Sequence, residues 1–490
     1  MPKQFSLVSL FVLAALGSLT VTARADYTTT VNPSTKWGVW EGWGCSLAWW
    51  ANVFGSREDI ADIVFTTKST VLNGKTLPGL GMTIARYNAG GCSTVAAYGS
   101  NIVFSPNIPD FKKIQGYWLD WTSANPASNS WNWFADSNQR TMLWKARDRG
   151  ATHLELFSDT PMWWMCTNSN PSGANNGANN NLQTWNTQQH AVYLATIAKY
   201  AADNWGVTFD SVEAFNEPIS NWWVSTGTQE GCHFDASTQA TVASALRTEL
   251  DNRGLTTMKV AASDENTYDE ATSTWNSFNA AAQTAVGRVD VHGYQYAGGR
   301  RDLLFRAVNG KNLWNTEYGE GDASGMSLAS NLNLDLRWLH PTAWCYWQPL
   351  DSGGWGLIQS NPSDNWIGTA NPKYFVLSQF SRHIRPGMTI IDGGENNTTA
   401  AYNPVAHKLV LVTTNYGAGQ WVNYDLSRFG TVSGPITRWA TDTSSTGDKY
   451  AIHNDTVLNG RKFRAYFTPH SVQTFEIQNA RLITTRHGRH

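Results

Sequence analysis

The chain has 490 residues, a formal net charge of −2 at pH 7 and 15% charged residues. Lysine and arginine form no concentrated run before the terminal stretch RLITTRHGRH, so we expect no nucleic-acid partner, because binding to phosphates needs a dense basic face. The 25 tryptophans exceed what a core usually needs, and their flat faces favour a carbohydrate ligand.

The first 25 residues predict a secretory signal peptide. Lys3 provides a positive start, residues 5–16 form an apolar core too short to span a bilayer, and residues 23–25 (Ala-Arg-Ala) form a cleavage signal. An uncleaved membrane anchor is the alternative. Because no later stretch approaches a transmembrane helix, we expect a secreted, extracellular protein with no membrane span.

Residues 43–384 alternate short apolar runs with amphipathic helical stretches. Ser56, Asn186 and Ser237 are the expected N-caps of three of these helices. Eight strand–helix units predict an α/β fold, a (β/α)8 TIM barrel, and an open doubly wound sheet is the alternative. The apolar runs begin at residues 43, 81, 152, 210, 258, 289, 311 and 341.

The pattern of apolar and polar residues changes after residue 384. Closely spaced strands and turns with no helical period predict a side domain, an antiparallel β-sandwich, over residues 385–479. We expect residues 480–490 to form a tail. Acceptor sequons at Asn396, Asn397 and Asn454 would be used only in a host that glycosylates.

Two glutamates follow apolar runs at matching positions. In the fourth run, EAFNEP, proline cannot continue a strand, so the strand must end and leave Glu217 at its carboxyl tip. Glu317 has the same position in the seventh run, LWNTEYG. Catalytic groups of a barrel lie at these tips, and the fourth and seventh strands lie across the barrel, so a substrate bond could fit between the two carboxylates.

A carboxylate pair of this kind cleaves glycosidic bonds, one member protonating the leaving oxygen and the other attacking C1 or activating water. Glu317 must be ionised to attack, and Tyr294 and Arg86 are candidate hydrogen-bond donors to it. Asn216 can bind a sugar hydroxyl beside Glu217. A non-catalytic carbohydrate-binding protein is the alternative from another class. The scattered histidines and cysteines have no metal-ligand spacing, so we expect neither a metal site nor a cofactor.

Motifs along nearly the whole mature chain resemble glycoside hydrolase family 30. They are EGWGCSLAWWA (41–51), ARYNAGG (85–91), SDTPMWWM (158–165), EAFNEP, VHGYQY, LWNTEYG and FTPHSVQTFEI (467–477). The resemblance implies a retaining glycosidase with Glu217 as acid/base and Glu317 as nucleophile. It also implies that residues 26–42 join the side β-sandwich. Around the sugar at the cleavage point it places Arg86, Trp163, Asn216, His292, Tyr294 and Trp347.

Two of these motifs, GWGCSLAWWA and SDTPMWWM, look most like the endo-β-1,6-galactanase branch of the family. The implied activity is hydrolysis of β-1,6-galactan, with a β-1,6-glucanase or a glucosylceramidase-like hydrolase as alternatives. A 1,6-linked chain has an extra rotatable bond per unit, so we expect broad stacking surfaces at the barrel mouth. We expect the protein to be a monomer, and we expect the polysaccharide to be its only partner. The expected surfaces are Trp43, Trp49, Trp163, Trp164 and Trp347.

The five cysteines leave at least one thiol unpaired, and Cys345 is the candidate. Cys166 and Cys232 are predicted to form a disulfide, because each follows a neighbouring strand, the third and the fourth, into loops on the same face. A Cys45–Cys92 pair fits the same logic.

Overall fold

The computed structural model describes residues 26–483, so the predicted signal peptide and the last residues of the predicted tail lie outside the described part. Eight strands form a closed barrel in which every neighbouring pair is parallel. This confirms the predicted barrel and excludes the open sheet. The strands are β3 (Gly42–Ser46), β6 (Ile84–Asn88), β7 (His153–Phe157), β8 (Ser211–Glu213), β9 (Lys259–Glu265), β10 (Val286–His292), β11 (Asn312–Glu317) and β12 (Ala343–Tyr346).

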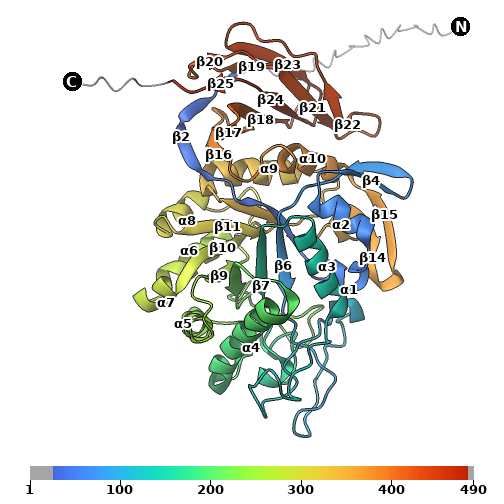
Figure 1. Ribbon diagram of the computed structural model, residues 1–490, viewed down its shortest axis with the longest axis vertical. Helices are drawn as coiled ribbons and strands as arrows, with labels where there is room; N and C mark the ends of the chain where they lie inside the picture. The colour runs from blue at the N-terminus through green and yellow to red at the C-terminus, as the bar shows by residue number, and fades with distance from the viewer. Residues whose placement is uncertain (1–25, 484–490) are drawn as a thin grey trace, which may run out of the picture.

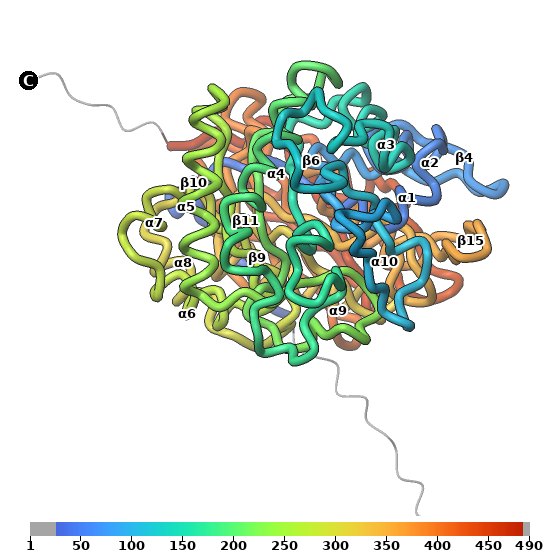
Figure 2. The backbone as a smooth tube through the Cα atoms, turned by 90° about the horizontal axis from the view of Figure 1, so that it is seen from below, coloured from blue at the N-terminus to red at the C-terminus, as the bar shows by residue number. Residues whose placement is uncertain are grey.

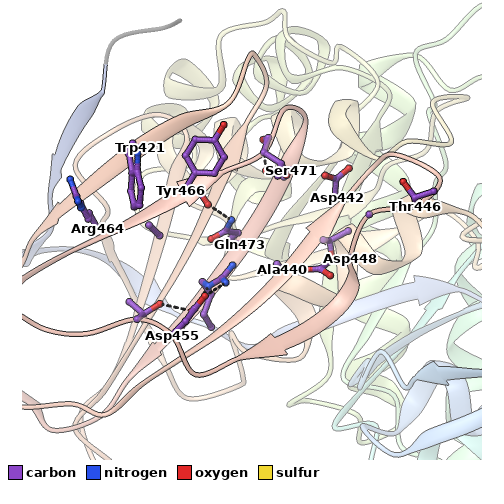
Figure 3. A pocket seen from close by; sticks show the side chains of 16 residues that line it. Trp421, Ala440, Asp442, Thr446, Asp448, Asp455, Arg464, Tyr466, Ser471 and Gln473 are labelled. Atoms are coloured by element: carbon purple, nitrogen blue, oxygen red, sulfur yellow. Dashed lines mark hydrogen bonds and ion pairs between the residues drawn. The ribbon is translucent and has the colours of Figure 1, made fainter.

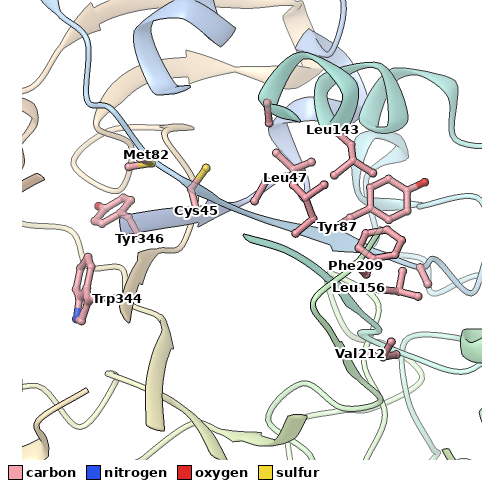
Figure 4. Packing of buried hydrophobic residues seen from close by; sticks show 14 of the residues in the cluster. Cys45, Leu47, Met82, Tyr87, Leu143, Leu156, Phe209, Val212, Trp344 and Tyr346 are labelled. Carbon is pink, nitrogen blue, oxygen red and sulfur yellow. The ribbon is translucent and has the colours of Figure 1, made fainter. Parts of the chain in front are cut away.

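Helices surround the barrel, as the view from its loop-bearing end shows (Figure 2). Apolar side chains of strands and helices meet between the two layers, for example Tyr87 of β6 near Leu143 of α3 (Figure 4). Full burial of one such side chain contributes about 1.5–3 kcal/mol. The helices are α1 (Trp50–Phe54), α2 (Glu58–Phe65), α3 (Ser137–Asp148), α4 (Thr187–Tyr200), α5 (Ala236–Asn252), α6 (Tyr268–Ser277), α7 (Ala280–Ala285), α8 (Arg301–Ala307), α9 (Met326–Leu334) and α10 (Pro372–Ser381).

Two of the three predicted N-caps, Ser56 and Ser237, are wrong, and the third, Asn186, is confirmed as the N-cap position. The N-cap residue of α2 is Arg57 rather than Ser56, and that of α5 is Asp235, whose carboxylate accepts a hydrogen bond from the Thr238 N–H. Ser237 lies in the first turn and donates its hydroxyl to Asp235 instead. Asn186 does stand at the N-cap of α4, but its side chain makes no cap bond. Aspartate and serine cap equally well, so adjacent candidates are not separable by residue type.

The side domain combines strands from both ends of the described chain (Figure 1). A seven-stranded sheet, in the order β2-β16-β17-β18-β24-β21-β22, and a three-stranded sheet, β1-β19-β23, enclose a second hydrophobic core. The predicted side β-sandwich is therefore confirmed. Its strands are β1 (Tyr27–Thr30), β2 (Asn32–Val39), β16 (Thr389–Asp392), β17 (Thr398–Asn403), β18 (Lys408–Asn415), β19 (Gln420–Asp425), β21 (Ile436–Asp442), β22 (Lys449–His453), β23 (Lys462–Phe467) and β24 (Ser471–Ile477).

Three smaller sheets complete the described fold. One of them includes Ala480–Arg481, which pairs with Thr431–Val432, so the segment expected to be a tail begins with a strand. None of the helices in residues 26–483 is both long and apolar enough to cross a membrane. The remaining strands are β4 (Ser69–Leu72), β5 (Lys75–Pro78), β13 (Leu350–Asp351), β14 (Ile358–Asn361), β15 (Trp366–Ala370), β20 (Thr431–Val432) and β25 (Ala480–Arg481).

All five cysteines are buried free thiols, so the predicted Cys166–Cys232 disulfide is wrong, and so is the Cys45–Cys92 alternative. The Cys166 Sγ lies 3.7 Å from the Met162 carbonyl oxygen, within its own turn. The Cys232 Sγ lies 3.5 Å from the carbonyl of its neighbour His233. Burial raises the pKa of the Cys166 thiol to about 12, so it is packed as a neutral group.

Candidate active site

Glu217 and Glu317 both lie at the carboxyl end of the barrel, as the strand pattern predicts. β8 ends at Glu213, and Glu317 is the last residue of β11. Glu217 has a φ of +49°, a left-handed conformation that costs a non-glycine residue about 1–2 kcal/mol. Two backbone contacts hold it: its N–H donates to the Asp264 carbonyl (2.8 Å), and its carbonyl accepts from Trp223 Nε1 (2.9 Å).

The two carboxylates lie close enough for direct chemistry on one bond. One oxygen of each, together with a ring nitrogen of His292, lies within 4.8 Å of the others. Both side chains are almost fully buried. In glycosidases, carboxyl groups about 5–5.5 Å apart leave no room for an intervening water, whereas about 6.5–9.5 Å would admit one. The arrangement therefore fits direct attack by one carboxylate on the sugar.

Glu317 has the donors that the sequence suggested for it. The Tyr294 hydroxyl donates to Oε1 (2.7 Å), and the Arg86 guanidinium approaches Oε2 (3.5 Å). Burial raises the pKa of Glu317 to about 7; His292 and Arg86 oppose this rise, and the Glu217 carboxylate adds to it. A neighbouring negative charge thus makes ionisation of Glu317 harder.

Glu217 has different partners. Asn266 Nδ2 donates to its Oε1 (2.7 Å), and His292 Nδ1 lies 3.1 Å from the same oxygen. Sequence reasoning missed Asn266, which directly follows Asp264 and Glu265 at the end of β9. Asp264 lies beneath the site and Glu265 accepts from Gln239 and Thr274 between β9 and the surrounding helices, so neither lines the cavity.

His292 is a cation between the carboxylates. Its Nδ1 lies 3.1 Å from Glu217 and 3.6 Å from Glu317, and its Nε2 lies 3.5 Å from Asp264. Burial alone would lower the pKa of His292, but Glu317 and Asp264 outweigh it and raise the pKa to about 10. The positive charge offsets the repulsion between the two catalytic candidates.

Arg86 belongs to an ionic network inside the barrel. It is fully buried, donates to Glu155 (2.7 Å) and to Asp264, and reaches the Thr316 carbonyl (3.0 Å). The same guanidinium therefore forms ion pairs in the barrel interior and approaches Glu317. Arg288 also contacts Glu155 in this layer.

A second group of acids lies below this network. Oxygens of Glu213, Asp264 and Asp290 lie within 4.8 Å of one another, and all three residues are buried. Burial, followed by the charges of Asp264 and Asp290, raises the pKa of Glu213 well above its usual range. Arg86 binds Asp264 and Arg288 binds Asp290 in this group. The protein itself thus supplies the positive charge in this group.

A cavity of about 540 Å³ opens over the carboxylates. Trp49 and Trp347 line it edge to face (4.9 Å between centroids), and the Lys112 ammonium lies 3.7 Å from the Trp49 ring. Asn216 borders Glu217, and its Oδ1 accepts no hydrogen bond from a described residue. Lining residues that sequence reasoning missed are Lys112, Gln229, Asn266, Tyr296, Asp351, Ser352 and Trp355.

Three of the tryptophans expected at the barrel mouth do not line this cavity. Trp43 is buried under the barrel and donates from Nε1 to the Ile384 carbonyl (2.7 Å). Trp163 is fully buried, and Trp163 and Trp164 line a neighbouring cavity instead. The spacing that places Trp163 after the third strand is right, but its indole turns away from the carboxylates into the loop layer.

A cavity of about 520 Å³ lies on the side domain, away from the carboxylates (Figure 3). Trp421 and Tyr466 border it, and charged side chains such as Arg438 and Asp455 form ion pairs within it. It shares no lining residue with the cavity over Glu217 and Glu317.

Comparisons with known proteins agree with this geometry. The family O-Glycosyl hydrolase family 30 matches residues 20–319. An endo-β-1,6-galactanase from Hypocrea rufa is 53% identical over 468 residues, which cover 94% of this chain and 97% of that protein. The catalytic domain of family 30 xylanase C from Talaromyces cellulolyticus has a TM-score of 0.67 and 22% identity, over 92% of this chain and all of that one.

A family 30 subfamily 8 xylanase from Clostridium acetobutylicum has the same TM-score of 0.67 at 20% identity, over 92% of this chain and 99% of that one. At this identity the two xylanases support the fold alone. The family match over more than half of the chain and the near full-length relative support more: they confirm the resemblance read from the motifs. This chain belongs to O-glycosyl hydrolase family 30 and is a glycoside hydrolase.

Proposed function

We propose that this protein is an endo-β-1,6-galactanase that cleaves its polymer with retention, Glu317 acting as nucleophile and Glu217 as acid/base. The observation that carries the proposal is the closely spaced carboxylate pair in a chain 53% identical, over almost its whole length, to an endo-β-1,6-galactanase. Neither a glucanase nor a binding protein without activity is favoured by these observations.

In the first step, a Glu317 oxygen attacks C1 of the sugar while Glu217 gives its proton to the leaving oxygen. Tyr294 and Arg86 hold the attacking carboxylate in place through the contacts described above. A covalent glycosyl-enzyme results. In the second step Glu217 takes a proton from water, and that water attacks C1 and releases the sugar with its original configuration.

The cavity supplies the binding surfaces for this reaction. Asn216 Oδ1 is available to a sugar hydroxyl next to the cleaved bond, because it accepts no hydrogen bond from a described residue. Trp49, Trp347 and Trp355 provide aromatic surface above the carboxylates. Asn266 orients Glu217, and His292 stabilises both carboxylates before the substrate arrives.

The proposal extends to location and assembly. Residues 1–25 have the features of a secretory signal peptide, which supports export of an enzyme whose substrate is an extracellular polymer. A monomer is also proposed, since the pair of carboxylates that the reaction needs is present within one chain.

The substrate is tested by comparing initial rates on de-arabinosylated β-1,6-galactan and on pustulan-type β-1,6-glucan. We expect faster release of short oligosaccharides from the galactan, because a site that binds the axial 4-hydroxyl of galactose leaves polar groups unpaired when glucose occupies it. Faster release from the glucan would overturn the galactanase assignment and leave the two-carboxylate mechanism intact.

We expect the fall of kcat/KM on the acidic side of the pH profile to reflect protonation of Glu317. Its pKa of about 7 predicts that kcat/KM falls as the pH drops below about 7, because a protonated carboxyl cannot attack. The profile is measured with 2,4-dinitrophenyl β-1,6-galactobioside, whose leaving group needs no proton. A profile with no acid limb near pH 7 would contradict the assignment.

A further inference from the structure

A second cavity, of about 570 Å³, lies in the loop layer that also carries the active site. Five tryptophans line it: Trp118, Trp121, Trp163, Trp164 and Trp185. They come from the segments that follow β6 and β7, at the carboxyl end of the barrel. The segment after β6 also contributes Lys112 to the catalytic cavity, so one stretch of chain borders both sites.

The inner indoles of this cavity are held by hydrogen bonds and ring stacking, whereas the outer indoles are exposed to solvent. Trp164 Nε1 donates to the Trp118 carbonyl (2.8 Å), and Trp118 stacks on Trp131 at 4.9 Å between centroids. Trp121 and Trp185, by contrast, are 46% and 72% exposed. Burial of indole surface stabilises a fold, so two large exposed indoles at a cavity rim indicate a surface kept for a ligand.

The other lining side chains are polar and uncharged. They comprise the amides of Gln183, Asn186 and Gln189, two serine hydroxyls and one alanine methyl. The Gln189 Oε1 and the Trp163 Nε1 are buried and have no hydrogen-bond partner among the described residues. Because the lining has no charged side chain, it cannot offset the free-energy cost of taking an acidic or basic ligand out of water. It suits a molecule with apolar faces and neutral hydroxyl edges.

We propose that this tryptophan-lined cavity is a second galactan-binding site, which holds an uncharged stretch of the polymer outside the catalytic cavity. The ligand class, a neutral sugar chain, follows from the exposed indoles and the uncharged lining. The choice of galactan rests on the proposed function. Binding here raises the local concentration of polymer at the carboxylates without taking part in bond cleavage.

The cavity is tested with Trp185→Ala and Trp121→Ala, and Trp338→Ala is the matched control, since Trp338 is 44% exposed on a segment outside this cavity. KM is measured on long β-1,6-galactan and on 4-nitrophenyl β-1,6-galactobioside, which is too short to reach both cavities. We expect the KM for the polymer to rise about tenfold in the two variants, with kcat and the short substrate unchanged. The control should behave as the parent.

Binding without turnover is measured by affinity electrophoresis of Glu317→Gln in gels that contain β-1,6-galactan. Adding Trp185→Ala should reduce the retardation, and adding Trp338→Ala should not. Equal retardation in both double variants would overturn the inference, and so would an equal rise in KM for polymer and short substrate. If the parent leaves galactan intact, the proposed function is wrong, and the electrophoresis, repeated with β-1,6-glucan, still decides whether the cavity binds a neutral polymer.

Discussion

Glu317→Ala is expected to lower the rate of galactan hydrolysis by roughly 10⁴-fold or more, because it removes the proposed nucleophile. The carboxylate is buried, held by Tyr294 and Arg86, and lies within 4.8 Å of a Glu217 oxygen. The rate is measured by reducing-sugar release. Glu395→Ala, at an exposed position of the side domain, is the control and should keep full activity.

Glu217→Ala should behave differently. On galactan its rate should fall by about 10²–10⁴-fold, the usual contribution of general acid–base catalysis. On 2,4-dinitrophenyl β-1,6-galactobioside the first step should survive, since dinitrophenolate leaves without a proton. Added azide should then attack the glycosyl-enzyme and give a glycosyl azide of retained configuration. If Glu217→Ala and Glu317→Ala lost activity equally on both substrates, the two roles would not be separable.

Retention itself is checked on the unmodified enzyme. Proton NMR of the first product released from galactan should show the β-anomer before mutarotation. The short separation of the carboxylates requires this, because an inverting enzyme needs a water between its second carboxylate and C1. An initial α-anomer would contradict the roles given to both residues.

Local sequence patterns were enough to predict the barrel and the position of its two glutamates. Each barrel strand is a short apolar run, and Pro218 prevents the chain from continuing as a strand beyond Glu217, although β8 already ends at Glu213. Because parallel strands present their carboxyl ends to one face, two glutamates at matching strand ends had to converge. No knowledge of side-chain packing entered that step.

What the sequence could not give depends on packing between distant segments. Lys112 reaches the catalytic cavity from a long loop, and Trp163 turns into the neighbouring cavity, although both lie in segments that follow barrel strands. The Cys166 and Cys232 thiols share a face and still point into their own turns. Side-chain direction in a loop is set by tertiary contacts, which residue spacing does not encode.

The ion pairs inside the barrel also depend on packing between segments that are distant in the sequence. Arg86 binds Glu155, its register partner on the neighbouring strand β7, and Asp264 on β9, farther around the barrel. A one-residue shift in a strand would turn its side chain to the other face. Local patterns identify the arginine but not which acids it meets.

Deletion of residues 388–490 is expected to give insoluble protein, because the side domain and the barrel share one hydrophobic core. Met388, Ile390, Val410, Val412 and Val472 belong to the same buried cluster as the barrel side chains. Their removal exposes the barrel side chains that they cover; fully burying one such side chain contributes about 1.5–3 kcal/mol, and a typical domain is stable by only about 5–15 kcal/mol.

Polar contacts across the same boundary add to this effect. The Gln379 side chain of α10 donates to Thr441 (2.8 Å), and the Thr474 hydroxyl donates to the Gln379 carbonyl (2.8 Å). His383 lies 3.0 Å from Glu476. Deletion removes these contacts, and a hydrogen bond of this kind contributes about 0.5–1.5 kcal/mol net to stability. β2, which pairs with β16, would also lose its neighbour.

The experiment compares the truncation after residue 387 with a truncation after residue 483, which removes only residues outside the described structure. Soluble fractions and galactan hydrolysis are measured for both. The shorter deletion should match the parent, whereas the longer one should appear in the pellet, because the surface of α9 and α10 that packs on the sandwich would face water. A soluble and fully active product of the longer deletion would mean that the barrel folds alone and that the side domain is a separable module.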